Sequence, residues 1–172
     1  MRRHRRKGSA MIEFTLVGIP MIFVLVSIFE MSRAMWVYHT LAYAVKDAVR
    51  FAVVHGKSCE TAGGQATTVQ QIAERVQWAG VGLLPDVLNL SLTTASGTVN
   101  CFPLASCLAI AGPPATPGNT ARWPPEPGNM RGDTLVATGT YPFRSALSMF
   151  WPGAGPGMTF GTFTLRANSR ET

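Results

Sequence analysis

Charged residues are scarce in this sequence, and those present are unevenly placed. Only 14% of the 172 residues are charged, whereas 47% are hydrophobic, which is a low charge content for a soluble domain. The formal net charge is +6, but residues 1–8 hold five of the fifteen Lys and Arg residues. The rest of the chain therefore has ten basic and nine acidic residues, and this balance argues against a basic face that binds nucleic acid.

Histidine and cysteine are also scarce, with three of each. No cysteines are spaced as CxxC and the histidines do not complete a ligand set, so we expect no metal and no cofactor. The stretch HGKSC brings His55 near Cys59, but a nucleophilic pair needs a third group that orients the base, and none is identifiable. Glu13 and Glu30 are too far apart to act as a carboxylate pair. We therefore predict no catalytic residues and no enzymatic activity.

A long apolar run follows the basic N-terminus. Residues 14–29 carry no charge, and extension back to Ser9 gives 21 residues, or about 31 Å of helix. The hydrocarbon core of a bilayer is about 30 Å thick. The sequence thus predicts a transmembrane helix over residues 9–30, with Glu13 near its cytoplasmic end. Pro20 is expected to loosen or kink this helix, which membrane helices tolerate.

The charges that flank the run predict its orientation. Five basic residues precede it, and only Arg33 follows closely, so the N-terminus should be cytoplasmic and the chain beyond residue 31 external. Trp36 and Tyr38 then occupy the position of an interfacial aromatic belt. A cleaved secretory signal peptide is the alternative, but no convincing small-residue cleavage site follows the apolar core.

The helical pattern continues beyond the apolar run. Apolar residues recur at a helical spacing and predict that residues 31–55 form an amphipathic continuation of the same helix, which Gly56 ends. They are Met31, Ala34, Met35, Tyr38, Leu41, Ala42, Val45, Ala48, Val49 and Ala52.

Residues 56–172 predict a small external domain. Thr68 and Gln71 form a capping-box pattern that opens a second helix. Alternating apolar residues predict three strands, at 87–94, 133–143 and 159–168, which form an antiparallel sheet packed on the long helix. Residues 112–128 hold six of the twelve prolines and predict an extended surface loop. The fold class is therefore α+β, with a membrane-spanning N-terminal helix and a small external domain.

The three cysteines of an external domain predict one disulfide and one remaining thiol. A bond from Cys59 to Cys101 or Cys107 would tie the loop after the long helix to the sheet. We favour it over a Cys101–Cys107 bond, which would close only a short loop. Buried reduced cysteines are the alternative.

The N-terminus resembles a type IV prepilin signal. The leader, MRRHRRKG over residues 1–8, is followed by Ser9, by Glu13 as the fifth residue after Gly8, and by the apolar span. With Phe14 after Glu13, and with the continuation EMSRAMWVYHTLAYAVKDAVRFAVVHG, the chain is similar to the TadE-like pseudopilins of the Flp/Tad branch. The stretches VATGTYPFR and TFTLRANSR resemble the closing strands of that family.

The resemblance implies that a prepilin peptidase cuts between Gly8 and Ser9. The new Ser9 amine would then be a cation near the Glu13 carboxylate, and pairing would offset part of the cost of holding either charge in an apolar phase. The pair could join neighbouring subunits and set their axial register, or form within one subunit about one helical turn apart.

The resulting expectation is a minor pseudopilin or assembly protein of a Flp (Tad) type IV pilus or a related secretion machine. It would be a single-pass protein of the bacterial inner membrane, with its C-terminal domain periplasmic or extracellular. The resemblance implies as partners a prepilin peptidase, other pilins or pseudopilins and the inner-membrane assembly platform, besides the lipid bilayer. The alternative is an unprocessed single-span protein whose external domain binds a ligand.

Overall fold

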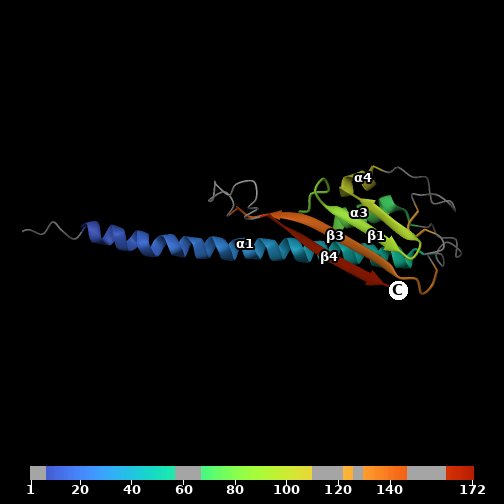
Figure 1. The fold of residues 1–172 in the computed structure, drawn as a ribbon, viewed down its shortest axis with the longest axis horizontal. Helices are drawn as coiled ribbons and strands as arrows, with labels where there is room; N and C mark the ends of the chain where they lie inside the picture. The colour runs from blue at the N-terminus through green and yellow to red at the C-terminus, as the bar shows by residue number, and fades with distance from the viewer. Residues whose placement is uncertain (1–6, 57–66, 110–121, 126–129, 147–161) are drawn as a thin grey trace, which may run out of the picture. The chain divides into compact units, whose positions relative to one another are not determined.

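A computed structural model of the protein describes residues 7–56, 67–109, 122–125, 130–146 and 162–172. A long helix, α1 (Lys7–Val54), is followed by α3 (Val69–Ala79), β1 (Asn89–Thr94), β2 (Gly97–Cys101), α4 (Leu104–Leu108), β3 (Leu135–Arg144) and β4 (Thr162–Glu171) (Figure 1). The predicted α+β class is confirmed: a long apolar N-terminal helix precedes a small domain with a helix and an antiparallel sheet. The sheet has four strands rather than three.

The chain divides into two compact units, which are described separately. The span unit comprises Met1–Met35 and Arg144–Thr162, and the sheet unit comprises Trp36–Phe143 and Phe163–Thr172. Helix α1 contributes residues to both units.

Helix α1 has 48 residues and contains Pro20, so the proline does not end it. In the sheet unit one stripe of the helix is buried, formed by Leu41, Ala44, Val45, Ala48, Val49 and Ala52. The predicted amphipathic stripe is thus correct from Leu41 onward. It is wrong for Met31, Met35 and Tyr38, whose side chains are exposed although they continue the same spacing.

Helix α3 begins as its capping box predicts. The Thr68 hydroxyl accepts a hydrogen bond from the Gln71 amide (3.2 Å), and the Gln71 side chain accepts one from the Thr68 amide (3.1 Å). These bonds satisfy two backbone donors that the first turn of a helix leaves unpaired. The apolar face of α3 is buried, through Val69, Ile72, Ala73, Val76 and Ala79.

The sheet has the strand order β2-β1-β3-β4, and β1 pairs antiparallel with both of its neighbours. Leu88, Leu90 and Leu92 are buried, as their alternation predicts, and so are Leu135, Ala137, Gly139 and Phe143 of β3. Pro142 lies beyond the stretch of β3 that pairs with β1, so its missing N–H interrupts no bond of that ladder.

Strand β2 and helix α4 were not predicted. β2 forms a hairpin with β1, in which Thr94 pairs with Gly97, and Gly97 has a φ of +155° that disfavours other residues. Four of the five β2 residues are exposed or only half-buried, so the strand has no apolar alternation. The predicted proline-rich loop at 112–128 lies mostly outside the described residues; its described part includes Trp123, which is fully buried.

The disulfide corrects the pairing that the sequence favoured. Cys101, at the end of β2, is bonded to Cys107 in α4, with 5.5 Å between their Cα atoms. Helix α4 begins at Leu104 and turns the chain back, which brings the two cysteines together. A bond from Cys59 to either is therefore not formed, and Cys59 lies outside the described residues.

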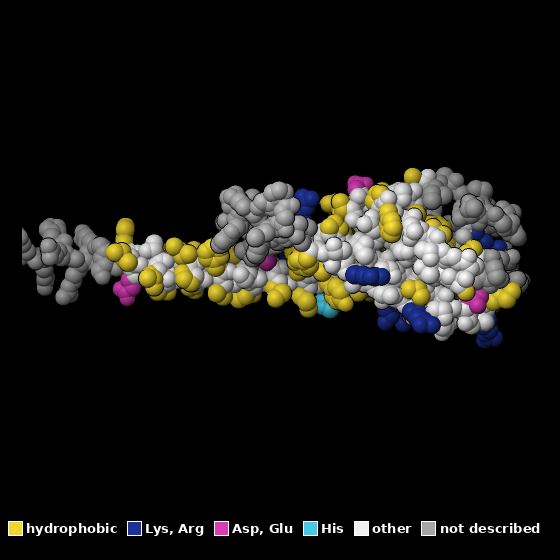
Figure 2. Space-filling view, viewed as in Figure 1, with side chains coloured by type: hydrophobic (Ala, Val, Ile, Leu, Met, Phe, Trp, Pro, Cys, Tyr) yellow, Lys and Arg dark blue, Asp and Glu magenta, His cyan; other side chains and the backbone are white. Residues whose placement is uncertain are grey.

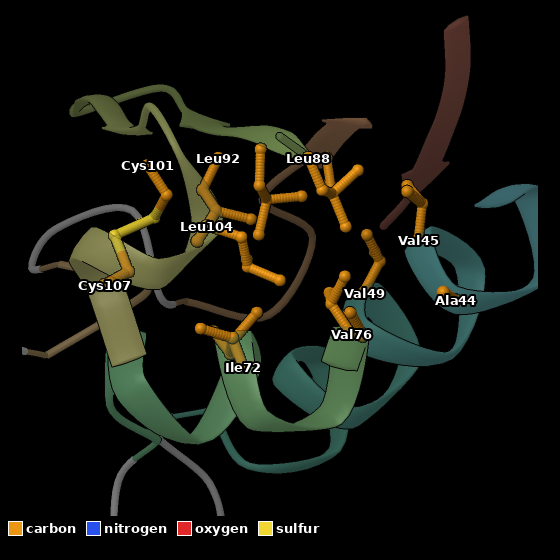
Figure 3. Packing of buried hydrophobic residues seen from close by; sticks show 14 of the residues in the cluster. Ala44, Val45, Val49, Ile72, Val76, Leu88, Leu92, Cys101, Leu104 and Cys107 are labelled. Carbon is orange, nitrogen blue, oxygen red and sulfur yellow. A yellow bond between two sulfur atoms is a disulfide. The ribbon is translucent and has the colours of Figure 1, made fainter. Parts of the chain in front are cut away.

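The core of the sheet unit joins all of these elements (Figure 3). Side chains of α1, α3, β1 and α4 meet in one cluster, to which Val49, Val76, Leu92 and Leu104 contribute. Burial of a side chain of this size stabilises a fold by about 1.5–3 kcal/mol. The C-terminal half of α1 is thus an integral part of the sheet unit's core.

Candidate membrane-insertion and processing segment

The N-terminal part of α1 presents apolar side chains to its surroundings. Between Met11 and Phe29 nearly all large hydrophobic residues are more than half exposed, including Phe14 (78%) and Phe29 (70%). Figure 2 shows hydrophobic side chains along this part of the helix. Contiguous apolar surface of this extent is rare on soluble monomers. The segment is long and apolar enough to cross a membrane, and it is not buried inside the protein.

Hydroxyl groups in this segment are satisfied within the helix. Thr15 Oγ1 donates to the Met11 carbonyl (2.8 Å), and Ser27 Oγ donates to the Phe23 carbonyl (2.8 Å). Such bonds matter in lipid, where no water is present to replace them. These two hydroxyl groups are therefore compatible with an apolar surrounding.

Glu13 lies on this helix with its side chain exposed. Among the described residues it has no hydrogen-bond or ion-pair partner. Gly8 and Ser9 lie within the first residues of α1, which begins at Lys7. Ser9 and Glu13 are therefore four residues apart on a helix, the spacing at which groups share one face.

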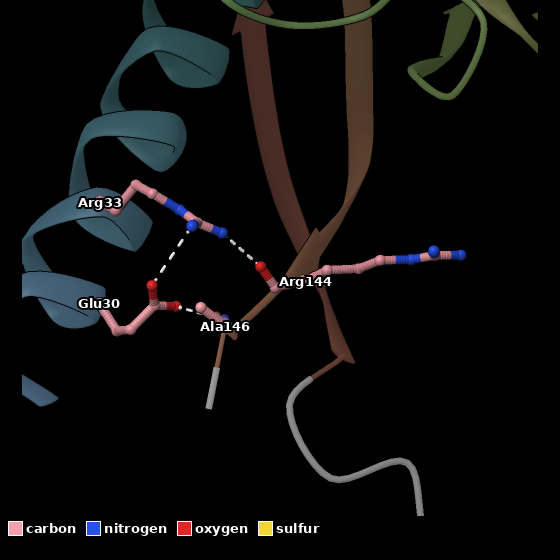
Figure 4. A network of polar contacts seen from close by, with 4 residues as sticks. All are labelled: Glu30, Arg33, Arg144 and Ala146. Carbon is pink, nitrogen blue, oxygen red and sulfur yellow. Dashed lines mark hydrogen bonds and ion pairs between the residues drawn. The ribbon is translucent and has the colours of Figure 1, made fainter. Parts of the chain in front are cut away.

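The second carboxylate, Glu30, has partners instead. The residue is buried (6% exposed), and its carboxylate oxygens accept hydrogen bonds from Arg33 Nη1 (3.2 Å) and from the Ala146 amide (3.0 Å) (Figure 4). Arg33 Nη2 donates to the Arg144 carbonyl. These four residues belong to the span unit. The carboxylate thus connects the helix to the segment that follows β3.

Sequence reasoning identified Glu30 only as a flanking charge. The signal available was an acid with an arginine three residues later at the end of an apolar run. The backbone partners at Arg144 and Ala146 lie more than a hundred residues away, and no local pattern points to them.

Of the HGKSC stretch, the structure describes only His55 and Gly56. His55 Nδ1 lies 2.8 Å from the Phe51 carbonyl, and the imidazole ring packs on the Phe51 ring with 4.3 Å between centroids. Cys59 is outside the described residues. The histidine thus contacts the end of its own helix.

Part of α1 is similar to a known protein family. Residues 8–50 match the model of the TadE-like protein family. The match confirms the resemblance inferred from the leader, Glu13 and the helix. It starts at Gly8 and includes the apolar segment, Glu30 and Arg33. Neither a search of curated proteins nor a search of solved structures finds a significant match.

The TadE-like match relates the chain to the Tad/Flp pilus machinery. The long apolar N-terminal helix fits a single-pass membrane protein of such a system. Both statements concern mainly the first 50 residues, and the sheet unit from Phe51 onward lies beyond the match.

Proposed function

We propose that the chain is a minor pseudopilin or assembly protein of a Flp (Tad) type IV pilus or a related secretion machine, and that a prepilin peptidase cuts it between Gly8 and Ser9. One observation carries this proposal: the TadE-like match begins at Gly8 and continues through an apolar helical segment that the protein leaves uncovered. Cleavage before that segment keeps the span on the mature protein. The proposed role is structural rather than enzymatic.

The proposed topology places the N-terminus in the cytoplasm and the sheet unit outside the inner membrane. Two independent features support it. Basic residues cluster before the span, as the positive-inside rule requires. The Cys101–Cys107 disulfide belongs to the part assigned to the outside, and disulfides persist in oxidising compartments such as the bacterial periplasm.

Glu13 is proposed to pair with the amine of Ser9 once the leader is removed. Its exposed carboxylate without a partner among the described residues supports this role, because an unpaired charge in lipid is costly. The partner amine belongs to a neighbouring subunit or to the same chain. Other pilins or pseudopilins, the assembly platform and the peptidase are the proposed protein partners.

The test is the mass of the mature protein. The full chain is expressed with and without a prepilin peptidase, extracted from membranes and analysed by intact mass and N-terminal sequencing. We expect Ser9 as the first residue only when the peptidase is present. Gly8→Ala should abolish cleavage. Gly18→Ala is the matched control, because a Cβ there would meet only Phe14, at 3.9 Å, and it should be cleaved normally.

An intact leader in the native host would contradict the proposal. Retention of Met1 with an active peptidase, and no difference between Gly8→Ala and Gly18→Ala, would favour the alternative of an unprocessed single-span protein with an external ligand-binding domain.

A further inference from the structure

The sheet unit has an open recess between the C-terminal part of α1 and the outer face of α3. One lining residue comes from α1 and five come from α3: Phe51, Gln71, Glu74, Arg75, Gln77 and Trp78. Both helical stretches belong to the sheet unit. The volume of this α1–α3 recess is about 530 Å³, which is within the range of small-ligand sites, about 300–1,000 Å³.

The walls of the α1–α3 recess are held in place by contacts within the protein. Val49 of α1 and Val76 of α3 are buried in one cluster, which keeps the two helices together (Figure 3). The Arg75 guanidinium lies over the Phe51 ring, with Cζ 5.0 Å from the ring centroid, and this cation–π contact fixes its position. A ligand of this recess therefore has little protein ordering to offset.

The charged groups of the recess require a ligand that both donates and accepts hydrogen bonds. Arg75 only donates, an ionised Glu74 only accepts, and the Gln77 amide does both. Glu74 accepts a hydrogen bond from the Gln70 amide (3.1 Å), and among the described residues no ion pair involves Glu74 or Arg75. An acyl chain offers neither kind of group, and the prolines of a proline-rich peptide lack N–H donors. Glutamate is also depleted at the core of protein interfaces.

The exposed indole of Trp78 supplies the apolar part of the recess. Trp78 is 74% exposed, so the faces of its ring are largely uncovered. A pyranose sugar has a C–H face that packs on an aromatic ring and hydroxyl groups that each donate and accept hydrogen bonds. Sugar rings therefore match both the indole and the mixed polar groups beside it.

We infer that the α1–α3 recess binds an oligosaccharide of pyranose sugars. One ring stacks on the Trp78 indole, while hydroxyl groups donate to the Glu74 carboxylate and accept from the Arg75 guanidinium. This site lies in the part of the chain beyond the TadE-like match, apart from Phe51 entirely on α3. The inference does not depend on cleavage at Gly8 or on pilus assembly.

Fluorine NMR of the full chain tests this binding. The protein is labelled with fluorotryptophan in micelles of a detergent without a sugar headgroup, and Trp78→Phe assigns the Trp78 line. It is titrated separately with cellohexaose, chitohexaose and hexagalacturonate, which are neutral, N-acetylated and acidic probes. We expect at least one probe to shift the Trp78 line saturably, with a Kd below about 1 mM. The lines of Trp36, which is exposed outside the recess, and of the buried Trp123 should not move.

Substitutions that keep the Trp78 reporter test the polar contacts. Glu74→Ala and Arg75→Ala should each raise the Kd of the probe about tenfold or more, because each removes a charged hydrogen-bonding group. Arg166→Ala is the matched control, since Arg166 is an exposed arginine of β4 outside the recess, and it should leave the Kd unchanged. The Trp123 line reports whether each variant is folded.

Two results would overturn the inference. One is a Trp78 line that none of the three probes shifts, which would leave the recess to a protein partner. The other is an equal Kd in Glu74→Ala, Arg75→Ala and Arg166→Ala. Neither result bears on cleavage at Gly8, so the proposed function is tested separately.

Discussion

Glu13 and Glu30 are acidic residues near the two ends of one apolar segment, and their carboxylates have different surroundings. Glu30 is buried and accepts hydrogen bonds from Arg33 and Ala146. Glu13 is exposed and has no partner among the described residues. A buried carboxylate with hydrogen bonds stabilises the fold of its own chain, whereas an exposed one in lipid requires a cation from elsewhere. Substitution of Glu30 should therefore change the stability of the local fold, whereas substitution of Glu13 should change assembly.

Substitution of Glu30 should loosen the backbone that follows β3. Glu30→Ala removes the acceptor of the Ala146 amide. A hydrogen bond to a charged group contributes about 1.5–3 kcal/mol when well formed, so we expect exchange of this amide to accelerate about tenfold or more. Hydrogen-exchange NMR of the chain in micelles measures it. Glu30→Gln, which keeps one acceptor oxygen, should have a smaller effect, and Glu13→Ala should have none. Unchanged exchange in Glu30→Ala would show that the bond does not form.

Substitution of Glu13 should spare the fold and impair assembly. We expect Glu13→Ala to insert into the membrane and to be cleaved normally, but to be incorporated poorly into the assembled machine, because the Ser9 amine loses its counter-ion. Co-purification with the other assembly components measures incorporation. Glu13→Asp keeps the charge and should recover part of it. Normal incorporation of Glu13→Ala would rule out the proposed pairing.

At the scale of elements, α1 and α3 differ in what makes them helical. Helix α3 is short, begins at a capping box and buries one face. A helix of this length is marginal in isolation and depends on its cap and its packing. The N-terminal part of α1 instead exposes its apolar side chains among the described residues, which fits a membrane-spanning segment.

Removal of the α3 cap should destabilise the sheet unit measurably. Thr68→Ala deletes the acceptor for the Gln71 amide, and loss of such a cap costs about 1 kcal/mol. Thermal or denaturant unfolding of the chain in micelles, followed by near-ultraviolet circular dichroism, reports this loss. The control is Gln77→Ala, which changes an exposed position of the same helix and should be nearly neutral. Equal stability of both variants would contradict a role for the cap.

At the scale of the whole molecule, the sheet unit is held together by close contact between α1 and β3. A Cβ atom added at Gly139 would lie 2.7 Å from Val45 Cγ2 and 2.9 Å from Leu41 Cδ1. The glycine therefore allows the strand to approach the helix. Because Leu90 of β1 pairs with Gly139, this contact also positions the next strand over the helix.

Gly139→Ala should weaken the packing of the helix on the sheet. Overpacking of a core by one methyl group costs about 1–3 kcal/mol, and we expect a loss of this size in the free energy of unfolding. Thr138→Val, on the opposite face of β3, should change it by only about 0.5 kcal/mol. A neutral Gly139→Ala would mean that the helix and the strand can separate without cost.

Much of this architecture was predictable because it depends on local patterns. The span follows from a long uncharged run, α3 from Thr68 and Gln71, and the faces of β1 and β3 from the alternation of residues such as Leu90 and Leu92. Strand β2 was missed because its side chains are mostly exposed and do not alternate. The stripe on α1 was extended too far, because spacing alone does not show where a helix meets its core.

The sequence by itself determined the class of the protein: a basic leader, an apolar span and a family resemblance are properties of neighbouring residues. Only the tertiary structure decided which distant groups meet. It paired Cys101 with Cys107, brought Ala146 to Glu30, and left Trp78 at the end of α3 exposed. Local sequence patterns show which residues favour a helix, a strand or burial. These contacts instead join residues far apart in the sequence, so they depend on how the chain folds back on itself.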